Sequence, residues 1–340
     1  MHPFYEFWRA ALVKTALTYA VLLVLLVGSV ALALLVGHGS LADPALRSTL
    51  LGLRATRVGA ALLAGAALAT GGAVVQGVFR DPLVSPSILG TTAGASLGGQ
   101  LAMLALVSGS PLANLAVSAE MVLPLGCLLG AGLSLAIVLT FCRERTGTLT
   151  LILTGFILSS LFLALSSFIT SLAQDSWDMS RAVVSFTLGG VGGVSTRQLF
   201  AVLPLVGIGI LACWLWSDNL DLLLSGEDEA GSLGVEVGRA RRWAVTWVAV
   251  LAAAAIAVGG NVGFVGLIVP HTLRPLVGVR HRRLIPACAL LGGAFLVACD
   301  VIARVFPSRS ELPLGVITGI IGAPVFLILL ARSQREVSHG

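Results

Sequence analysis

The sequence predicts an all-α polytopic membrane protein that forms one transmembrane domain over residues 1–340. Hydrophobic residues make up 57% of the chain, charged residues only 11%, and the mean hydropathy is +0.99. A soluble globular protein carries roughly a quarter of charged residues. Apolar runs of about 20 residues recur from end to end, which is the length that an α-helix needs to cross about 30 Å of hydrocarbon. These observations predict about ten membrane-spanning helices.

The first helix is expected at 15–36. Aromatic residues from Phe4 to Trp8 precede it beside Arg9 and Lys14, and this composition suits the headgroup layer of the membrane. The apolar run is longer than that of a cleaved signal peptide. Polar, glycine-rich or proline-rich breaks separate the later runs, so the other helices are expected at 55–79, 87–108, 113–141, 148–173, 198–217, 243–262, 267–277, 284–306 and 314–331.

Basic residues are distributed unequally between the two sides of this threading. Of the 21 lysines and arginines, most fall on the side that holds both termini. The opposite side receives Arg47, Arg54, Arg57, Arg181, Arg197, Arg304 and Arg309. The positive-inside rule therefore predicts that both termini are cytoplasmic. This asymmetry also explains the net charge of +5 without a nucleic-acid partner.

A weak internal repeat supports the threading. Gly71-Gly72 is followed by Pro82, and Gly259-Gly260 is followed by Pro270 at the same spacing. The two copies lie five helices apart, so they cross the membrane in opposite directions. We interpret helices 2–5 and 7–10 as an inverted repeat, an architecture typical of transporters. Chance similarity between glycine-rich helices is the alternative.

The second copy of the repeat continues into GGNVGFVGLIVPHTLRP, residues 259–275, which is unusual between two apolar runs. We expect a non-helical bend at Gly259–Gly266, with Pro270 in the first turn of a helix too short to span the membrane. Broken backbone at membrane depth is tolerated only where protein buries it or water reaches it. The stretch therefore predicts a packed bundle with an internal path. The alternative role for some of its glycines is to allow close packing between helices.

The chain lacks the sequence motifs of several classes of enzyme. The only lysine is Lys14, so there is no P-loop, and H-E-x-x-H and G-x-S-x-G are also absent. The sequence has no C-x-x-C pair of the kind that indicates a metal or redox site. We therefore expect no cofactor or metal on this chain. His271 is interpreted as a packing residue in preference to a ligand or proton carrier. Few ionisable residues lie inside the spans, and the main candidate, Asp300, is near the outer third of its helix. The path therefore lacks an obvious ion-coupling site, and we expect the transport energy to come from another subunit.

The longest cytoplasmic loop, residues 218–242, is expected to form two short helices broken at Gly226 and around Gly231–Gly234. A solvated linker would not need its leucines, which include Leu222 and Leu233. Compact helices with apolar faces favour docking into a groove on a partner. A cap that packs only on the chain itself is the alternative.

Four segments, RATRVGAALLAGAALATGGAVVQGVFRDPLVSPSILGTTAGASLG (54–98), LSGEDEAGSLGV (224–235), GNVGFVGLIVPHTLRPLVG (260–278) and ELPLGVITGIIGAPVFLILL (311–330), carry a resemblance that covers nearly the whole chain. They resemble the permease family of ABC importers for iron–siderophores, haem and cobalamin. The resemblance implies ten helices per subunit and a homodimer in the lipid of the bacterial inner membrane. It also implies two ATP-binding ABC subunits, which hold ATP and Mg²⁺, and a periplasmic substrate-binding protein.

The resemblance implies a role for each matching segment. Residues 218–240 become the coupling helices that contact the ATPase, through Glu227, Asp228, Gly231, Leu233 and Gly234. Outward-facing arginines dock the binding protein, and these are Arg54, Arg57 and Arg304, with Arg309 as a further member. The path is lined by helix 5, helix 10 and residues 186–195, with Arg181, Phe186, Leu188, Gly189 and Gly190 as site residues. The turn at 81–86, with Asp81, Pro82 and Leu83, lies at the cytoplasmic gate.

The family often has tryptophan at or next to the position of Phe186, and this departure bears on the path lining. Among the subgroups, the chain is most similar to haem permeases. Arg181 and Arg197 are placed to attract haem propionates, and contact with the binding protein or with lipid phosphate is the equal alternative for such arginines. A ferric-siderophore or cobalamin permease is the alternative, followed by an ion-coupled secondary transporter. Gly259, Gly260, Pro270 and His271 are assigned structural roles.

Overall fold

The computed structural model describes residues 2–37, 44–107, 119–141, 148–175, 177–306 and 311–338, which form helices and no strand. The long helices are α1 (His2–Leu35), α2 (Pro44–Phe79), α3 (Thr91–Val107), α4 (Ala119–Phe141), α5 (Thr148–Leu172), α7 (Thr196–Leu215), α10 (Val237–Gly259), α12 (His281–Val305) and α13 (Leu314–Ser338). The shorter elements are η1 (Pro86–Leu89), η3 (Ala173–Asp175), α6 (Trp177–Leu188), α8 (Ser217–Leu224), α9 (Glu227–Ser232) and α11 (Val265–Val277).

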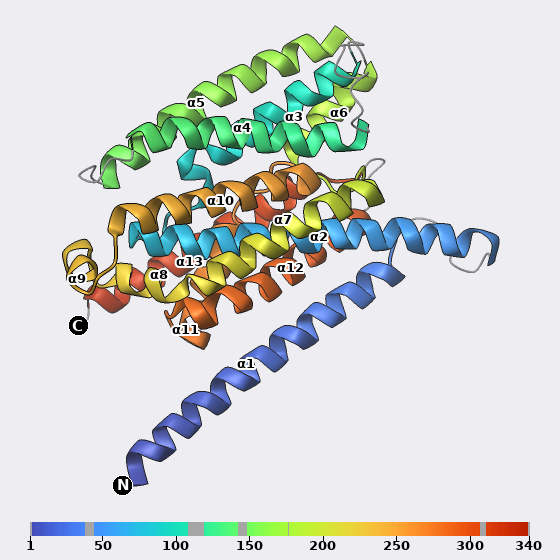
Figure 1. The fold of residues 1–340 in the computed structure, drawn as a ribbon. Helices are drawn as coiled ribbons and strands as arrows, with labels where there is room; N and C mark the ends of the chain where they lie inside the picture. The colour runs from blue at the N-terminus through green and yellow to red at the C-terminus, as the bar shows by residue number, and fades with distance from the viewer. Residues whose placement is uncertain are drawn as a thin grey trace.

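The helices form three groups around a buried centre (Figure 1). α3, α4, α5 and α6 lie together on one side, and α1, α11 and α12 lie on the other. Between them, α2 and α10 pack against each other, and α2 also contacts α7, α11 and α12. Both termini lie at the same end of the molecule as α8 and α9 (Figure 1).

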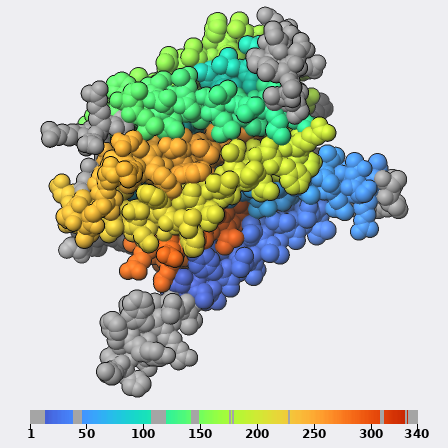
Figure 2. Space-filling model, in the orientation of Figure 1, coloured from blue at the N-terminus to red at the C-terminus, as the bar shows by residue number. Residues whose placement is uncertain are grey.

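Seven of the described helices are long and apolar enough to cross a membrane, namely α1, α2, α4, α5, α7, α10 and α12. The helices α1 and α4 lie at the surface of the bundle (Figure 2). Large apolar side chains on them are exposed, such as Val24 on α1 and Leu129 on α4. A soluble protein rarely exposes an apolar surface of this extent. The prediction of a polytopic membrane protein is confirmed. Each of the ten expected segments contains a helix, while the count of ten spans and the inverted repeat stay predictions.

Glycines allow the central helices to approach at backbone contact. A Cβ on Gly65 of α2 would lie 2.1 Å from the carbonyl oxygen of Gly292 on α12, and a Cβ on Gly72 would lie 1.9 Å from that of Gly266 on α11. On the other side of the bundle, Gly98 of α3 meets Gly126 of α4 in the same way. Small residues at crossings let backbones pack closely, which is how helices associate in lipid. The close-packing reading of the glycines therefore holds for Gly266.

The expected position of Pro270 is wrong. α11 begins at Val265, so Pro270 lies inside the helix and not in its first turn. A proline there cannot donate to the carbonyl four residues earlier, which belongs to Gly266. The side-chain amide of Gln76 donates to that carbonyl instead, at 3.3 Å. α11 has 13 residues, about 20 Å of helix, which is still too short to cross the hydrocarbon alone.

Candidate functional site

Three breaks in the chain meet at one junction inside the bundle. α6 ends at Leu188, α10 ends at Gly259, and α13 begins at Leu314. Main-chain hydrogen bonds join the three segments: Asn261 N donates to Phe186 O (3.2 Å), Gly190 N to Gly259 O (3.0 Å), and Leu314 N to Gly189 O (2.8 Å). The ends of the three helices and the residues that follow or precede them thus satisfy one another's backbone groups by bonds between segments.

The junction requires glycine at several positions. Gly260 (φ +65°) and Gly189 (φ +83°) adopt backbone conformations that other residues rarely take. A Cβ on Gly260 would lie 2.6 Å from the carbonyl oxygen of Phe186, and one on Gly315 would lie 2.4 Å from that of Leu188. The structure therefore brings together residues that the sequence analysis assigned to two separate roles, the path lining and the structural bend. The part played by Gly315 was missed, although the quoted segment 311–330 contains it.

A cavity of about 270 Å³ lies beside this junction. It is lined by residues 261–264 of the break, by the start of α11, and by η1 and its neighbours, with Ser85, Ser87, Thr92 and Asn261 as polar members. The non-helical stretch is shorter than expected, from Gly260 to Phe264, because α10 runs to Gly259 and α11 begins at Val265. The broken backbone thus borders a mainly apolar cavity that carries four polar side chains.

Two further residues of the short helix pack against α13. Phe264 caps the start of α11 with φ +67°, an unusual conformation for a bulky residue. A Cβ on Gly322 would lie 2.6 Å from the Cβ of Phe264, so the two backbones are close. His271 lies edge-on to Phe326, with ring centroids 6.5 Å apart. This contact fits the packing role expected for His271.

The expected gate residues form a tight turn at the end of α2. Arg80 has φ +54°, Asp81 N donates to Gln76 O at 3.2 Å, and the Asp81 carboxylate accepts from Leu83 N at 2.8 Å. The turn lies next to the break between α8 and α9, because a Cβ on Gly226 would lie 3.7 Å from the Arg80 guanidinium. The structure therefore brings the expected gate and the expected coupling segment together.

The loop at 218–242 contains the two expected short helices, α8 and α9, with the break at Gly226. Leu220 and Leu223 of α8 and Ala230 of α9 are buried in the chain's own core. Leu233 is 63% exposed, Asp228, Gly231 and Gly234 are also exposed, and no atom lies within 4 Å of a Cβ placed on Gly231. The segment is thus a self-packed cap on one face and an open surface on the other. The side chain of Glu227 lies outside the described residues.

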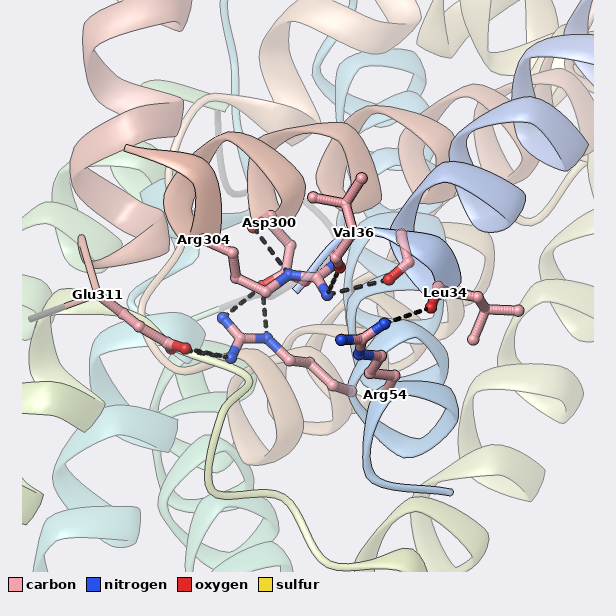
Figure 3. Close-up of polar contacts among 8 residues, drawn as sticks. Leu34, Val36, Arg54, Asp300, Arg304 and Glu311 are labelled. Atoms are coloured by element: carbon pink, nitrogen blue, oxygen red, sulfur yellow. Dashed lines mark hydrogen bonds and ion pairs between the residues drawn. The ribbon is translucent and has the colours of Figure 1, made fainter. Parts of the chain in front are cut away.

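The three arginines expected to dock a binding protein lie together, but two of them are buried. Arg54 donates to the carbonyl oxygens of Leu34 (2.9 Å) and Gly37 (3.0 Å). Arg304 donates to those of Ala33 (3.0 Å) and Val36 (2.8 Å) (Figure 3). Free carbonyls at a helix C-terminus attract cationic side chains. Arg54 and Arg304 therefore cap α1 and fasten its end to α2 and α12.

Arg57 connects this cluster to the surface. Its guanidinium pairs with Asp300, which is fully buried, at 2.9 Å, and with Glu311 at 2.8 Å. Asp300 also pairs with Arg304 at 3.0 Å. The sequence analysis missed Glu311 and did not pair Asp300 with these arginines, although Asp300 and Arg304 are four residues apart on one helix. Arg309 lies outside the described residues.

The remaining expected site residue, Arg181, is exposed on α6, and Arg197 lies 3.8 Å from Glu120 at the start of α4. Within the described part of the chain, no three His, Cys, Asp or Glu side chains lie close enough together to hold a metal ion.

Comparisons with known proteins agree with this architecture. The FecCD transport family matches residues 16–332. The chain is 38% identical over 285 residues to the cobalamin import system permease protein BtuC of Halobacterium salinarum, covering 84% of this chain and 73% of that protein. It is 37% identical over 281 residues to the Fe(3+) dicitrate transport system permease protein FecD of Escherichia coli, covering 83% and 84%.

A solved structure, described as the inward-facing conformation of an ABC transporter assigned to the metal-chelate type, has a TM-score of 0.81 to this chain at 32% identity. The match covers 93% of this chain and 99% of the other. The structural match and the family match therefore cover nearly the same part of the chain. The chain is a multi-pass inner-membrane protein that belongs to the FecCD transport family, the permease family of iron–siderophore, haem and cobalamin ABC importers.

Proposed function

We propose that this chain is the permease subunit of an importer that carries a large metal chelate across the inner membrane, driven by ATP hydrolysis in a separate subunit. The observation that carries the proposal is the FecCD match over residues 16–332. Two copies of the chain form the path, two ABC ATPases bind at the cytoplasmic side, and a substrate-binding protein docks outside. An exposed face on α8–α9 and an arginine cluster at the outer end of α1 support these two contact surfaces.

The cargo is a corrinoid or a ferric chelate. The relatives named for cobalamin and for ferric dicitrate are 38% and 37% identical to this chain, so identity does not separate the two cargoes. Both names support a metal chelate. Haem, which the sequence favoured, belongs to the same chemical class and is kept as a third cargo. In this proposal the chelate passes intact, and the binding protein selects it.

Residues within the chain take the following roles in this proposal. The 270 Å³ cavity beside the junction is part of the path, with Phe186, Leu188, Gly189 and Gly190 close to it. The turn at Asp81, Pro82 and Leu83 forms the cytoplasmic gate, next to α8 and α9. A path that must release its cargo gains nothing from one tight site, because tight binding to a single state slows departure.

Uptake into proteoliposomes tests the function and separates the cargoes. The vesicles carry this chain and its ATPase, and a cognate binding protein is supplied loaded with cobalamin, ferric dicitrate or haem. We expect ATP-dependent uptake with one of these chelates, and no ATP hydrolysis by the purified chain alone. Uptake that continues without the ATPase and follows an ion gradient would overturn the proposal in favour of a secondary transporter.

A further inference from the structure

The start of α12 holds a buried histidine that contacts the first coupling helix. Asp221 of α8 accepts two hydrogen bonds through the same oxygen, from the backbone N–H of His281 (2.8 Å) and from its ring nitrogen Nδ1 (2.7 Å). His281 is fully buried. Hydrogen bonds to a carboxylate are among the stronger ones in proteins, so α8 is fastened to the first residue of α12.

The other ring nitrogen of His281 faces α2. Nε2 lies 3.3 Å from the carbonyl oxygen of Ala73. Gly77, one turn later, leaves room for the ring, because a Cβ there would lie 2.4 Å from Nε2. The imidazole therefore fills the space between α8 and α2 and contacts each of them through one nitrogen.

The two residues after His281 are tied to other helices. The indole N–H of Trp214, on α7, donates to the carbonyl oxygen of Arg282 at 3.1 Å. The hydroxyl of Tyr19, on α1, donates to that of Arg283 at 2.5 Å. The start of α12 is thus held against α1, α7 and α8. A displacement of α8 is therefore passed to a helix start that is itself packed against its neighbours.

α2 leads from this contact directly to the expected gate. Ala73 and Gly77 lie within the last two turns of α2, which ends at Phe79, and the turn at Asp81–Leu83 follows. A continuous chain of contacts therefore runs from α8 through His281 to the end of α2. Energetic coupling between separate sites is carried by packed contacts and hydrogen bonds of this kind, and a direct coupling measurement is needed to assign it.

We propose that Asp221 and His281 are positioning residues that transmit movement of the coupling helices α8 and α9 to α2 and the gate. This inference rests on the proposed function. Neither side chain needs to touch the cargo or the ATPase. Their part is to make α8, α12 and the last turns of α2 move together when the ATPase changes conformation.

The test measures cargo transported per ATP hydrolysed in proteoliposomes that carry the complete transporter. Asp221→Ala and His281→Ala are each expected to lower this ratio about tenfold, within the usual range of coupling between sites. The double variant should lower it no further, because the two residues act as one contact. His281→Asn keeps a donor near Nδ1 and should recover part of the ratio. A merely structural role would reduce the amount of complex and leave the ratio unchanged.

Arg282→Ala is the matched control. Arg282 follows His281 directly and lies 3.6 Å from Asp218 on the same helix α8, but both side chains are exposed. Exposed ion pairs contribute little, so the ratio should stay within about twofold of wild type. Asp221→Leu is close in size to the native residue but cannot accept either hydrogen bond from His281, so it carries the test if the alanine variant does not assemble. A normal ratio in an assembled Asp221→Leu variant contradicts the inference, whereas a wild-type chain that neither binds an ATPase nor transports contradicts the proposed function itself.

Discussion

Two glycines of α2 have different surroundings. Gly72 faces the backbone of α11, whereas a Cβ on Gly52 of the same helix would have no atom within 4 Å. The Gly71-Gly72 doublet was noticed in the sequence for its spacing to Pro82, and its packing against Gly266 was not predictable. That contact joins segments almost 200 positions apart, and one sequence contains no record of which glycines meet.

Gly72→Ala is expected to lower the stability of the permease, because its Cβ would lie 1.9 Å from the carbonyl oxygen of Gly266 and the two helices must separate. Overpacking of this kind typically costs about 1–3 kcal/mol. Gly52→Ala should be neutral or slightly stabilising, since alanine is the better helix former. Thermal unfolding of the two variants in the same detergent measures the difference, and equal melting temperatures would show that α2 and α11 do not pack as described.

Charged residues show the same limit of sequence reasoning. Arg54, Arg57 and Arg304 were expected on the outer side, and the structure does bring them together. Their partners were not predictable, because Arg54 and Arg304 bind main-chain carbonyls at the end of α1 and carbonyls carry no residue-specific signal. Asp300 was noticed only as an acid inside a span.

Among the elements, those with a long apolar run were predictable, whereas the shorter elements were predictable only in part. The short helices α8 and α9 were expected from glycines that interrupt an apolar pattern. α6, with only 12 residues and two charges between Trp177 and Leu188, is too short and too polar to register as a span. The start of α11 was placed too late because Pro270 was taken as a first-turn signal, whereas Gln76 replaces its missing donor from another helix.

The exposed end of α9 gives a prediction for the coupling segment. Leu233→Asp should weaken association with the ATPase about tenfold or more and abolish transport, because apolar anchors dominate such contacts. Since Leu233 is 63% exposed, the permease itself should fold normally. Co-purification with the ATPase and thermal unfolding of the permease alone report the two effects separately.

Leu220→Asp is the matched control on α8. Leu220 is fully buried, so a charge there should destabilise the permease itself. A Leu233→Asp variant that bound the ATPase and transported like wild type would remove α9 from the coupling surface.

Across the whole molecule, the exposed surface of α8 and α9 and the cluster of Arg54, Arg57 and Arg304 lie at different ends of the bundle. α8 and α9 lie at the end that holds both termini (Figure 1), whereas Arg54 and Arg304 cap the far end of α1. The sequence predicted this separation from the threading of its apolar runs, and the positive-inside rule only assigned the cytoplasmic side. What it did not predict is that these arginines hold helices of the fold together, so removal of any of them is expected to lower the stability of the permease.

Arg57 and Glu311 give opposite predictions for binding-protein docking. Arg57→Ala should slow association a few-fold at low salt, because rim charges act mainly on the association rate. Glu311→Gln should speed it, because it frees the Arg57 guanidinium from its 2.8 Å partner for an acidic residue on the binding protein. Arg197→Ala, a comparable change of charge on the exposed side chain of α7, is the control. Association rates for the immobilised binding protein test this, and identical rates for the Arg57 and Glu311 variants at low salt would refute docking through Arg57.

The junction of α6, α10 and α13 has an evolutionary consequence. It is made of main-chain hydrogen bonds and of glycines with no side chain, so selection for the fold acts there on only a few positions. The side chains around it, such as Ser87 and Asn261 beside the cavity, are free to diversify without loss of the joint. Point mutations can therefore change the surface of the cavity while the joint between the three helices is inherited unchanged.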